Sequence, residues 1–176
     1  MSLADVLAPR SALTVPDVVA RAEAAAIRAR LRWTPYALLD RGRYAFCDDL
    51  DEPALYATLA RLAGGAVTSA RAYRLGPGDY TLARHDPPLA ERCVEIAVDL
   101  SAASVPGAEL HYRQRGQVFH RFPCVPGAAA IVERTPTVTS NHTYVSKLHA
   151  GAEIVRLVAR LAVPASRGPT SRDAGG

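Results

Sequence analysis

Residues 108–134 read AELHYRQRGQVFHRFPCVPGAAAIVER. Its apolar and aromatic runs are interrupted at Arg115-Gly116 and at Pro126-Gly127, residue pairs that are typical of tight turns. The spacing predicts strands near 108–114, 117–122 and 128–134. Outward from there, the same pattern predicts strands near 67–75, 80–86, 93–100, 141–147 and 153–162. Such a run of short strands is typical of a double-sheet jelly roll.

A first helix is predicted before the strands. Thr14 followed by Pro16 and Asp17 is typical of a helix start, and Trp33-Thr34-Pro35 is expected to end the helix. Apolar residues at helical spacing mark the face that we expect to be buried: Val15, Val19, Ala22, Ala26 and Ala29.

A second helix is predicted to begin at Asp51-Glu52-Pro53 and to end at Gly64-Gly65. Its inward residues are expected to be Leu55, Leu59 and Leu62. Between the two helices, residues 40–43 are predicted to belong to a short hairpin. Two one-sided helices suit packing against the outside of a sheet.

The size of the chain fits a single domain. Its 176 residues are 49% hydrophobic, which is enough to bury a core. We expect one domain over residues 1–164, and a disordered tail over 165–176 because that segment is rich in Ser, Gly and Arg. No apolar run approaches the roughly 20 residues that a membrane-spanning helix needs, and no signal peptide is recognised, so no membrane association is expected.

Charge and cysteine usage exclude some partners. The net charge is +4, but the arginines are scattered, so no nucleic-acid partner is predicted, whereas an acidic substrate or cosubstrate is compatible with them. The three cysteines, Cys47, Cys93 and Cys124, have no C-x-x-C spacing. Neither a disulfide framework nor a zinc cluster is therefore expected, and a reducing cytoplasm is the predicted location. The oligomeric state is not predicted.

The order of these elements resembles the Fe(II)/2-oxoglutarate dioxygenases of the prolyl-hydroxylase-like group. The segment from Tyr73 through Gly78-Asp79-Tyr80 to His85-Asp86 is similar to the lead-in and the metal-binding His-x-Asp of that family. Residues 107–110 are similar to its Gly-Gly-x-Leu, and Pro126-Gly127 to the Pro-Gly that precedes its distal histidine. The resemblance implies an α+β, mainly β fold: a double-stranded β-helix, or jelly-roll barrel, supported by two N-terminal helices.

The resemblance also implies cofactors and roles for particular residues. Fe(II) would be held by His85, Asp86 and His142, with Asp86 as the catalytic carboxylate, and 2-oxoglutarate would be the cosubstrate. Arg156 is implied as the anchor of the cosubstrate, and Tyr112 as a wall of its pocket. The implied reaction uses O2, converts 2-oxoglutarate to succinate by oxidative decarboxylation and hydroxylates an unactivated C–H bond of a small molecule, an amino acid or a peptide.

Strand parity supports an inward position for Arg156. In the last predicted strand Val155 and Leu157 share one face with Ala159 and Leu161, whereas Arg156 falls on the opposite face. A strand that is buried on both sides must give such a charge a partner. That partner is either the cosubstrate or a carboxylate, Glu95 or Asp99. Arg160 lies on the same face nearer the barrel end and is expected to be solvated; Lys147 is an alternative anchor.

One spacing departs from the family pattern. His85 and Asp86 are adjacent, so in a regular strand they point to opposite faces, and the position two residues after His85 is Pro87. A bulge at Asp86 would let both side chains reach one ion. Alternatively, His85 and His142 bind metal alone, as in two-histidine halogenases of the same superfamily. In the third interpretation Arg84 replaces the first histidine, and the chain is a ligand-binding or interaction module without the iron site.

Overall fold

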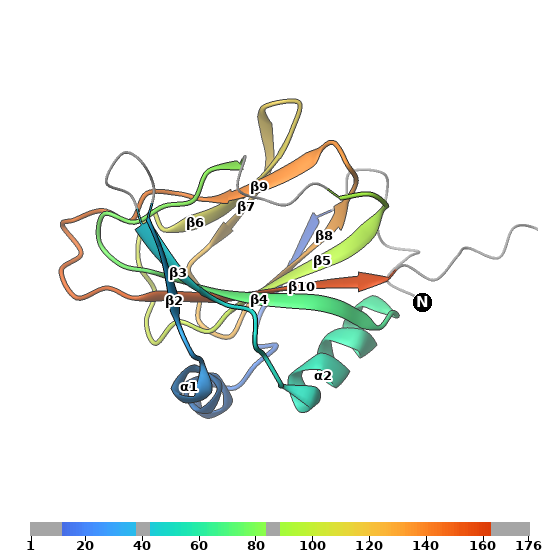
Figure 1. Ribbon diagram of the computed structural model, residues 1–176, viewed down its shortest axis with the longest axis horizontal. Coiled ribbons are helices and arrows are strands. Elements are labelled where there is room, and N and C mark those ends of the chain that lie inside the picture. Colours follow the sequence, from blue (N-terminus) through green and yellow to red (C-terminus); the bar gives the residue numbers. More distant parts are fainter. Residues whose placement is uncertain (1–11, 38–42, 84–88, 163–176) are drawn as a thin grey trace, which may run out of the picture.

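The computed structural model describes residues 12–37, 43–83 and 89–162, which form two antiparallel sheets and two helices (Figure 1). The seven-stranded sheet has the order β1-β8-β5-β10-β4-β3-β2, and the three-stranded sheet has the order β7-β6-β9. The strands are β1 (Ala12–Val15), β2 (Thr34–Ala37), β3 (Arg43–Cys47), β4 (Val67–Leu75), β5 (Cys93–Asp99), β6 (Glu109–Gln114), β7 (Gln117–Pro123), β8 (Ala129–Arg134), β9 (Val138–His142) and β10 (Ile154–Ala162). The helices are α1 (Arg21–Arg30) and α2 (Pro53–Ala63).

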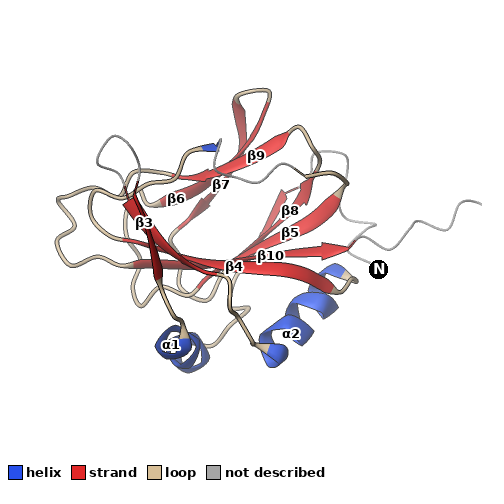
Figure 2. Cartoon of the chain, in the orientation of Figure 1, coloured by secondary structure: helices blue, strands red, loops and turns tan. Residues whose placement is uncertain are grey.

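The larger sheet has an apolar layer on each of its faces. Both helices lie on one side of it and the smaller sheet lies on the other, as Figure 2 shows. Val155, Leu157, Ala159 and Leu161 of β10 pack with the helices, while Val158 packs with the inner residues of β6, β7 and β8. The alternation predicted for this strand is therefore confirmed, and it leaves Arg156 facing the space between the sheets.

The second helix forms where the sequence predicts it. Pro53 occupies the first turn, and the chain stops at Gly64, whose φ of 74° is left-handed and whose N–H donates to Ala60 O over 2.8 Å. Leu55 and Leu59 are buried against the larger sheet, and Leu62 is partly buried there. All three inward residues of this helix are confirmed.

The first helix differs from the prediction. Ala12–Val15 is a strand, because its backbone pairs with the edge of β8, and the helix begins only at Arg21. Asp17 has a positive φ of 52°, which turns the chain between the strand and the helix. The buried residues of α1 are Ala24 and Ile27, so the predicted face was wrong: Ala22, Ala26 and Ala29 are exposed.

The remaining differences concern strand boundaries. β2 and β3 form the predicted hairpin, with Ala37 opposite Arg43, although residues 38–42 lie outside the described part of the chain. β9 begins at Val138 rather than at 141, because it pairs with β6 along its whole length. Residues 79–82 are not in a strand, although the Thr81 N–H donates to His142 O over 3.1 Å.

Cys47, Cys93 and Cys124 are all free, and among the described residues no helix is long and apolar enough to span a membrane.

Gly127 joins the strands to the N-terminal segment and generates a prediction. Its carbonyl accepts from the N–H groups of Val18 and Val19, its φ is 85°, and a Cβ there would lie 2.6 Å from Val19 O.

Gly127→Ala should therefore destabilise the protein by more than about 2 kcal/mol, because the strain of the left-handed backbone and the clash with the Val19 carbonyl both raise the free energy of the folded state. Gly107→Ala is the matched control, because Gly107 has a φ of 75° but open space around it. Urea unfolding measures the free energy of unfolding of both variants. Equal losses of stability in the two variants would contradict the clash at Gly127.

Candidate functional site

His142, at the end of β9, is held in one orientation inside the barrel. Its side chain is 4% exposed, and its ring packs on Tyr73 with the centroids 4.9 Å apart. Its backbone N–H donates to Thr81 Oγ1 over 2.7 Å, and the same oxygen lies 3.4 Å from His142 Nδ1. His142 Nε2 has no hydrogen-bond partner within the described ranges. When Nδ1 carries the proton, Nε2 therefore presents a buried lone pair.

The surroundings of His142 keep its ring neutral. Burial lowers its pKa well below the usual value, and the positive charge of Arg156 lowers it further. Neutral imidazole is the form that ligates metals. Thr81 supports the ring from the side of Nδ1, as hydrogen-bonding groups do behind a histidine that ligates a metal.

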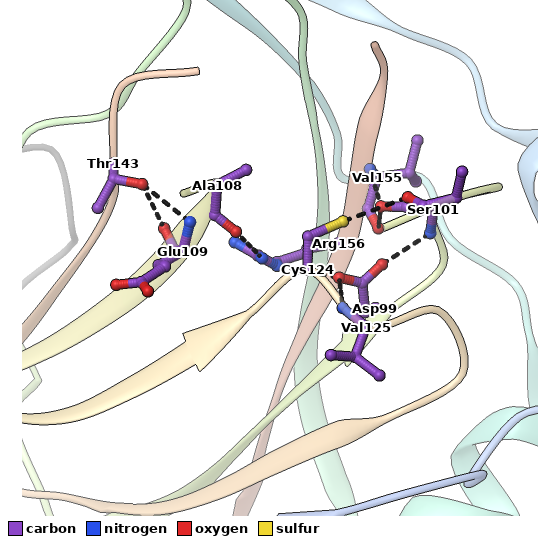
Figure 3. Close-up of polar contacts among 10 residues, drawn as sticks. Asp99, Ser101, Ala108, Glu109, Cys124, Val125, Thr143, Val155 and Arg156 are labelled. Carbon is purple, nitrogen blue, oxygen red and sulfur yellow. Dashed lines mark hydrogen bonds and ion pairs between the residues drawn. The ribbon is translucent and has the colours of Figure 1, made fainter. Parts of the chain in front are cut away.

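Arg156 and Asp99 form a buried ion pair across β10 and β5. The Nε of Arg156 lies 3.6 Å from Asp99 Oδ2, and the two side chains are 1% and 0% exposed. Asp99 also accepts from the N–H groups of Ser101 and Val125, and Arg156 Nη2 donates to Ala108 O over 2.9 Å (Figure 3). Burial lowers the pKa of Arg156, and the negative charge of Asp99 opposes this. The guanidinium is therefore fixed on two sides.

Tyr112 and Phe122 complete the surroundings of Arg156. The guanidinium carbon lies 5.4 Å from the centroid of the Phe122 ring, a cation–π distance. Tyr112, on the inner face of β6, is fully buried and near enough to affect the pKa of Arg156. Arg156 thus has aromatic side chains beside it in addition to its carboxylate partner.

Space around His142 is unevenly distributed. His142 and Arg156 line one hollow with Leu75, Val145 and Ile154, but the packing there leaves no room for a water molecule. On the other side of His142 lies a cavity of about 30 Å³, lined also by Tyr73, Glu95 and Arg160. The open space beside the histidine is therefore in the cavity that Arg156 does not line.

The structure brings together part of the predicted site. His142, Arg156 and Tyr112 all lie in the interior, and the roles predicted for them stay predictions. His85 and Asp86, like Arg84, lie outside the described residues, so their predicted roles stay predictions. Within the described ranges no three His, Cys, Asp or Glu side chains are grouped closely enough to hold a metal ion.

Sequence reasoning missed two features of this interior. Thr81 was not predicted to support His142, since its contact depends on two segments far apart in the chain. Arg160 was expected to be solvated, but its side chain is only 21% exposed, and its Nε lies 3.3 Å from Glu95 Oε2. Glu95 and Asp99 are an even number of residues apart along β5, so both side chains fall on the inner face. This spacing was the signal in the sequence that could have predicted a buried partner for Arg160.

The chain matches no protein-family model and no curated protein by sequence. Its structure is similar to solved structures. A 2OG-Fe(II) oxygenase family oxidoreductase from Burkholderia pseudomallei superposes with a TM-score of 0.61 at 13% identity, covering 85% of this chain and 84% of that one. A prolyl-4-hydroxylase from Pseudomonas putida gives 0.56 at 15% identity, covering 89% and 95%. EvdO2 from Micromonospora carbonacea var. aurantiaca, solved with 2-oxoglutarate, gives 0.53 at 17% identity, covering 91% of each chain.

These likenesses identify the fold. The chain has the jelly-roll fold of the 2-oxoglutarate-Fe(II) oxygenases, prolyl hydroxylases included. The mainly β barrel with two helices that the sequence predicted is thereby confirmed. At these low identities the comparison concerns architecture, so the reaction has to be argued from the site itself.

The Asp99–Arg156 pair generates a stability prediction. Asp99→Ala would leave a buried guanidinium without its carboxylate, which should cost about 3–5 kcal/mol in the free energy of unfolding. Asp48→Ala is the control: Asp48 also pairs with an arginine, Arg71 at 2.5 Å, but its side chain is 51% exposed. That change should cost about 1 kcal/mol or less. Chemical denaturation measures both, and similar losses would contradict the importance of burial.

The lowered pKa of His142 generates a pH prediction for the protein in the presence of a chelator. The unfolded chain binds a proton near pH 6.5 and the folded chain only at lower pH, so stability is retained above about pH 7 and falls below about pH 6.5. Titration of His142 contributes at most about 1.4 kcal/mol per pH unit to the slope of the free energy of unfolding against pH. In His142→Gln the slope between pH 6.5 and 5 should become shallower.

His149→Gln is the control for this experiment and should keep the full slope. A residual slope is expected even in His142→Gln, because burial also lowers the pKa of His120. Unfolding curves collected at several pH values measure how the free energy of unfolding of each variant changes with pH. If His142→Gln and the parent protein lose stability equally, His142 is not the titrating group.

Proposed function

We propose that this protein is an Fe(II)- and 2-oxoglutarate-dependent oxygenase that hydroxylates an unactivated C–H bond of a small molecule, an amino acid or a peptide. The observation that carries the proposal is the unpartnered Nε2 of His142. It belongs to a neutral, buried and oriented imidazole, inside a barrel whose fold is shared with oxygenases of this kind. A buried polar atom without a partner costs free energy, which a ligand bound there would recover.

His142 fits the donor set that Fe(II) requires. Imidazole and carboxylate groups suit Fe(II), and a facial set of two histidines and one carboxylate leaves positions for a cosubstrate and O2. In this proposal His85 and Asp86 supply the other two ligands. When bound, iron and 2-oxoglutarate supply the oxidising chemistry, in which the cosubstrate is decarboxylated to succinate.

Arg156 and Tyr112 are the proposed anchors of the distal carboxylate of 2-oxoglutarate. A guanidinium fork matches a carboxylate, and Asp99 together with Ala108 O holds this one in place before any ligand arrives. The apolar side chains that line the same hollow, Leu75, Val145 and Ile154, would exclude water from the bound cosubstrate. Because the hollow between His142 and Arg156 is packed, binding requires these side chains to move apart.

The proposal predicts stabilisation by ligands. Mn(II), used as a redox-silent substitute for Fe(II), should raise the melting temperature by mass action, and 2-oxoglutarate should raise it further. A ligand at about 100 times its Kd contributes about 2.7 kcal/mol, which for a chain of this size is a shift of about 5–10 °C. In His142→Ala the shift caused by the metal should be lost.

His149→Ala is the matched control, since His149 lies in the turn before β10 and is not among the residues that line the interior. It should keep both shifts. If neither Mn(II) nor 2-oxoglutarate changes the melting temperature of the parent protein, the oxygenase proposal is wrong. A non-catalytic binding module would then be the better description.

A further inference from the structure

Glu95, on the inner face of β5, is a buried carboxylate whose two oxygens have different surroundings. Its side chain is 1% exposed, and Oε2 accepts from Arg134 Nη1 over 2.7 Å and from Arg160 Nε over 3.3 Å. The buried Oε1 has no hydrogen-bond partner in the described part of the chain. Burying a carboxylate oxygen without a donor is costly, so a donor that reaches Oε1 would be favoured.

Glu95 lines the same small cavity as His142. The volume of this cavity is about 30 Å³, and Tyr73 and Thr81 are among its other walls. The space suits roughly one or two groups of the size of a water molecule. Like Glu95 Oε1, the buried Nε2 of His142 has no hydrogen-bond partner among the residues that the structure describes. Two side chains that each have an unpartnered buried atom therefore line one cavity.

A larger groove lies beside the cavity and opens to solvent. Its volume is about 430 Å³, which is in the usual range for small-molecule sites. The groove and the cavity share Tyr73, Val158 and Arg160. The ring of Tyr73 also packs on the ring of His142. A small molecule in the groove can therefore lie against Tyr73 and extend one group into the cavity.

The chemistry of Glu95 selects the group that can enter the cavity. A carboxylate oxygen only accepts hydrogen bonds, so Oε1 favours a group with an O–H or N–H and disfavours a ketone, an ether or a carboxylate. Ionised 2-oxoglutarate has only acceptors, so the cavity is unfavourable for it. A site with a buried polar group discriminates strongly against a ligand that leaves this group unpaired.

We propose that Glu95 is a specificity-determining residue, and that the substrate is a small molecule with a hydroxyl group that enters the cavity and donates to Glu95 Oε1. A hydroxyl group fits because it donates a hydrogen bond and is no larger than water. The rest of the substrate lies in the groove along Tyr73. Naming this ligand a substrate rests on the proposed function; its binding does not.

Matched probes test which group enters the cavity. 1-Phenylethanol and acetophenone have the same carbon skeleton, but the alcohol donates a hydrogen bond and the ketone only accepts. 1-Cyclohexylethanol and cyclohexyl methyl ketone form a second pair without an aromatic ring. Calorimetry and ligand-observed NMR measure Kd on the whole protein, alone and again with Mn(II) and 2-oxoglutarate. Each alcohol should bind about tenfold or more tightly than its ketone, because hydrogen bonds to charged groups are strong.

Glu95→Gln tests whether this preference comes from Glu95. The amide oxygen should stay with Arg134 and Arg160, which only donate, so the amide nitrogen replaces Oε1. An amide N–H donates to a ketone as well as to an alcohol. The preference for the alcohols should therefore disappear, with the ketones binding at least as tightly as the alcohols.

Glu133→Gln is the matched control. Glu133 lies opposite Val94, on the face of the larger sheet that packs with the helices, and it does not line the cavity. Like Glu95, it pairs with an arginine, Arg92, and has a buried oxygen without a partner within the described ranges. Its side chain is 11% exposed. This variant should keep the preference of the parent protein.

A second substitution at the same position covers the case in which Glu95→Gln fails to fold, since it removes a buried charge beside Arg134. Glu95→Asp keeps the charge and withdraws the carboxylate by one methylene group. The preference for the alcohols should fall about threefold or more in this variant, because the hydrogen bond becomes too long. Chemical denaturation confirms that each variant is folded.

The outcomes separate this inference from the oxygenase proposal. A preference for alcohols that depends on Glu95 supports the inference even if Mn(II) and 2-oxoglutarate have no effect on the protein. If alcohols and ketones bind the parent protein equally, or if neither alcohol binds, Glu95 does not select the ligand and the inference is wrong. If 1-phenylethylamine binds more tightly than 1-phenylethanol, the cavity takes an amine, and the assignment to an alcohol is wrong.

Discussion

Two buried pairs of opposite charge connect β5 to β10 in the middle of the larger sheet, and the rest of the interior is arranged around them. Asp99 and Arg156 are both almost completely excluded from solvent, so each would be very costly without the other. Backbone N–H groups of the chain after β5 and before β8 supply the remaining hydrogen bonds of Asp99. The pair thus fixes both the register of the two strands and the paths of the loops that leave them.

The same constraint shapes the chemistry of the interior. Arg156 lowers the pKa of His142, and burial acts in the same direction, so the imidazole is neutral and available as a ligand. Glu95 pairs with Arg160 four residues further along β10, and Arg134 also contacts the same carboxylate.

Sequence reasoning succeeded where the signal was local. Pro53 and Gly64 mark the ends of α2, and the alternation along β10 turns Arg156 inward. Sequence reasoning failed for the buried face of α1. Alanines lie on every side of this helix and Ile27 is its one large apolar side chain, so the periodicity could not select a face. β1 was missed because Thr14 and Pro16 are as compatible with a helix start as with a strand end. The contacts of Glu95 with Arg134 and Arg160 depend on the register of three strands that are distant in sequence, which no local pattern reveals.

The central place of β10 has a consequence for how the chain acquires its structure during synthesis. This strand pairs with β5 on one side and β4 on the other, yet it follows every other described strand in the sequence. Before β10 emerges from the ribosome, the larger sheet can form only as the separate sets β1-β8-β5 and β4-β3-β2, each with an unpaired inner edge. Long-range pairing of this kind is slow, and open edges invite association between chains. Nascent molecules should therefore depend on chaperones until residues 154–162 have been added.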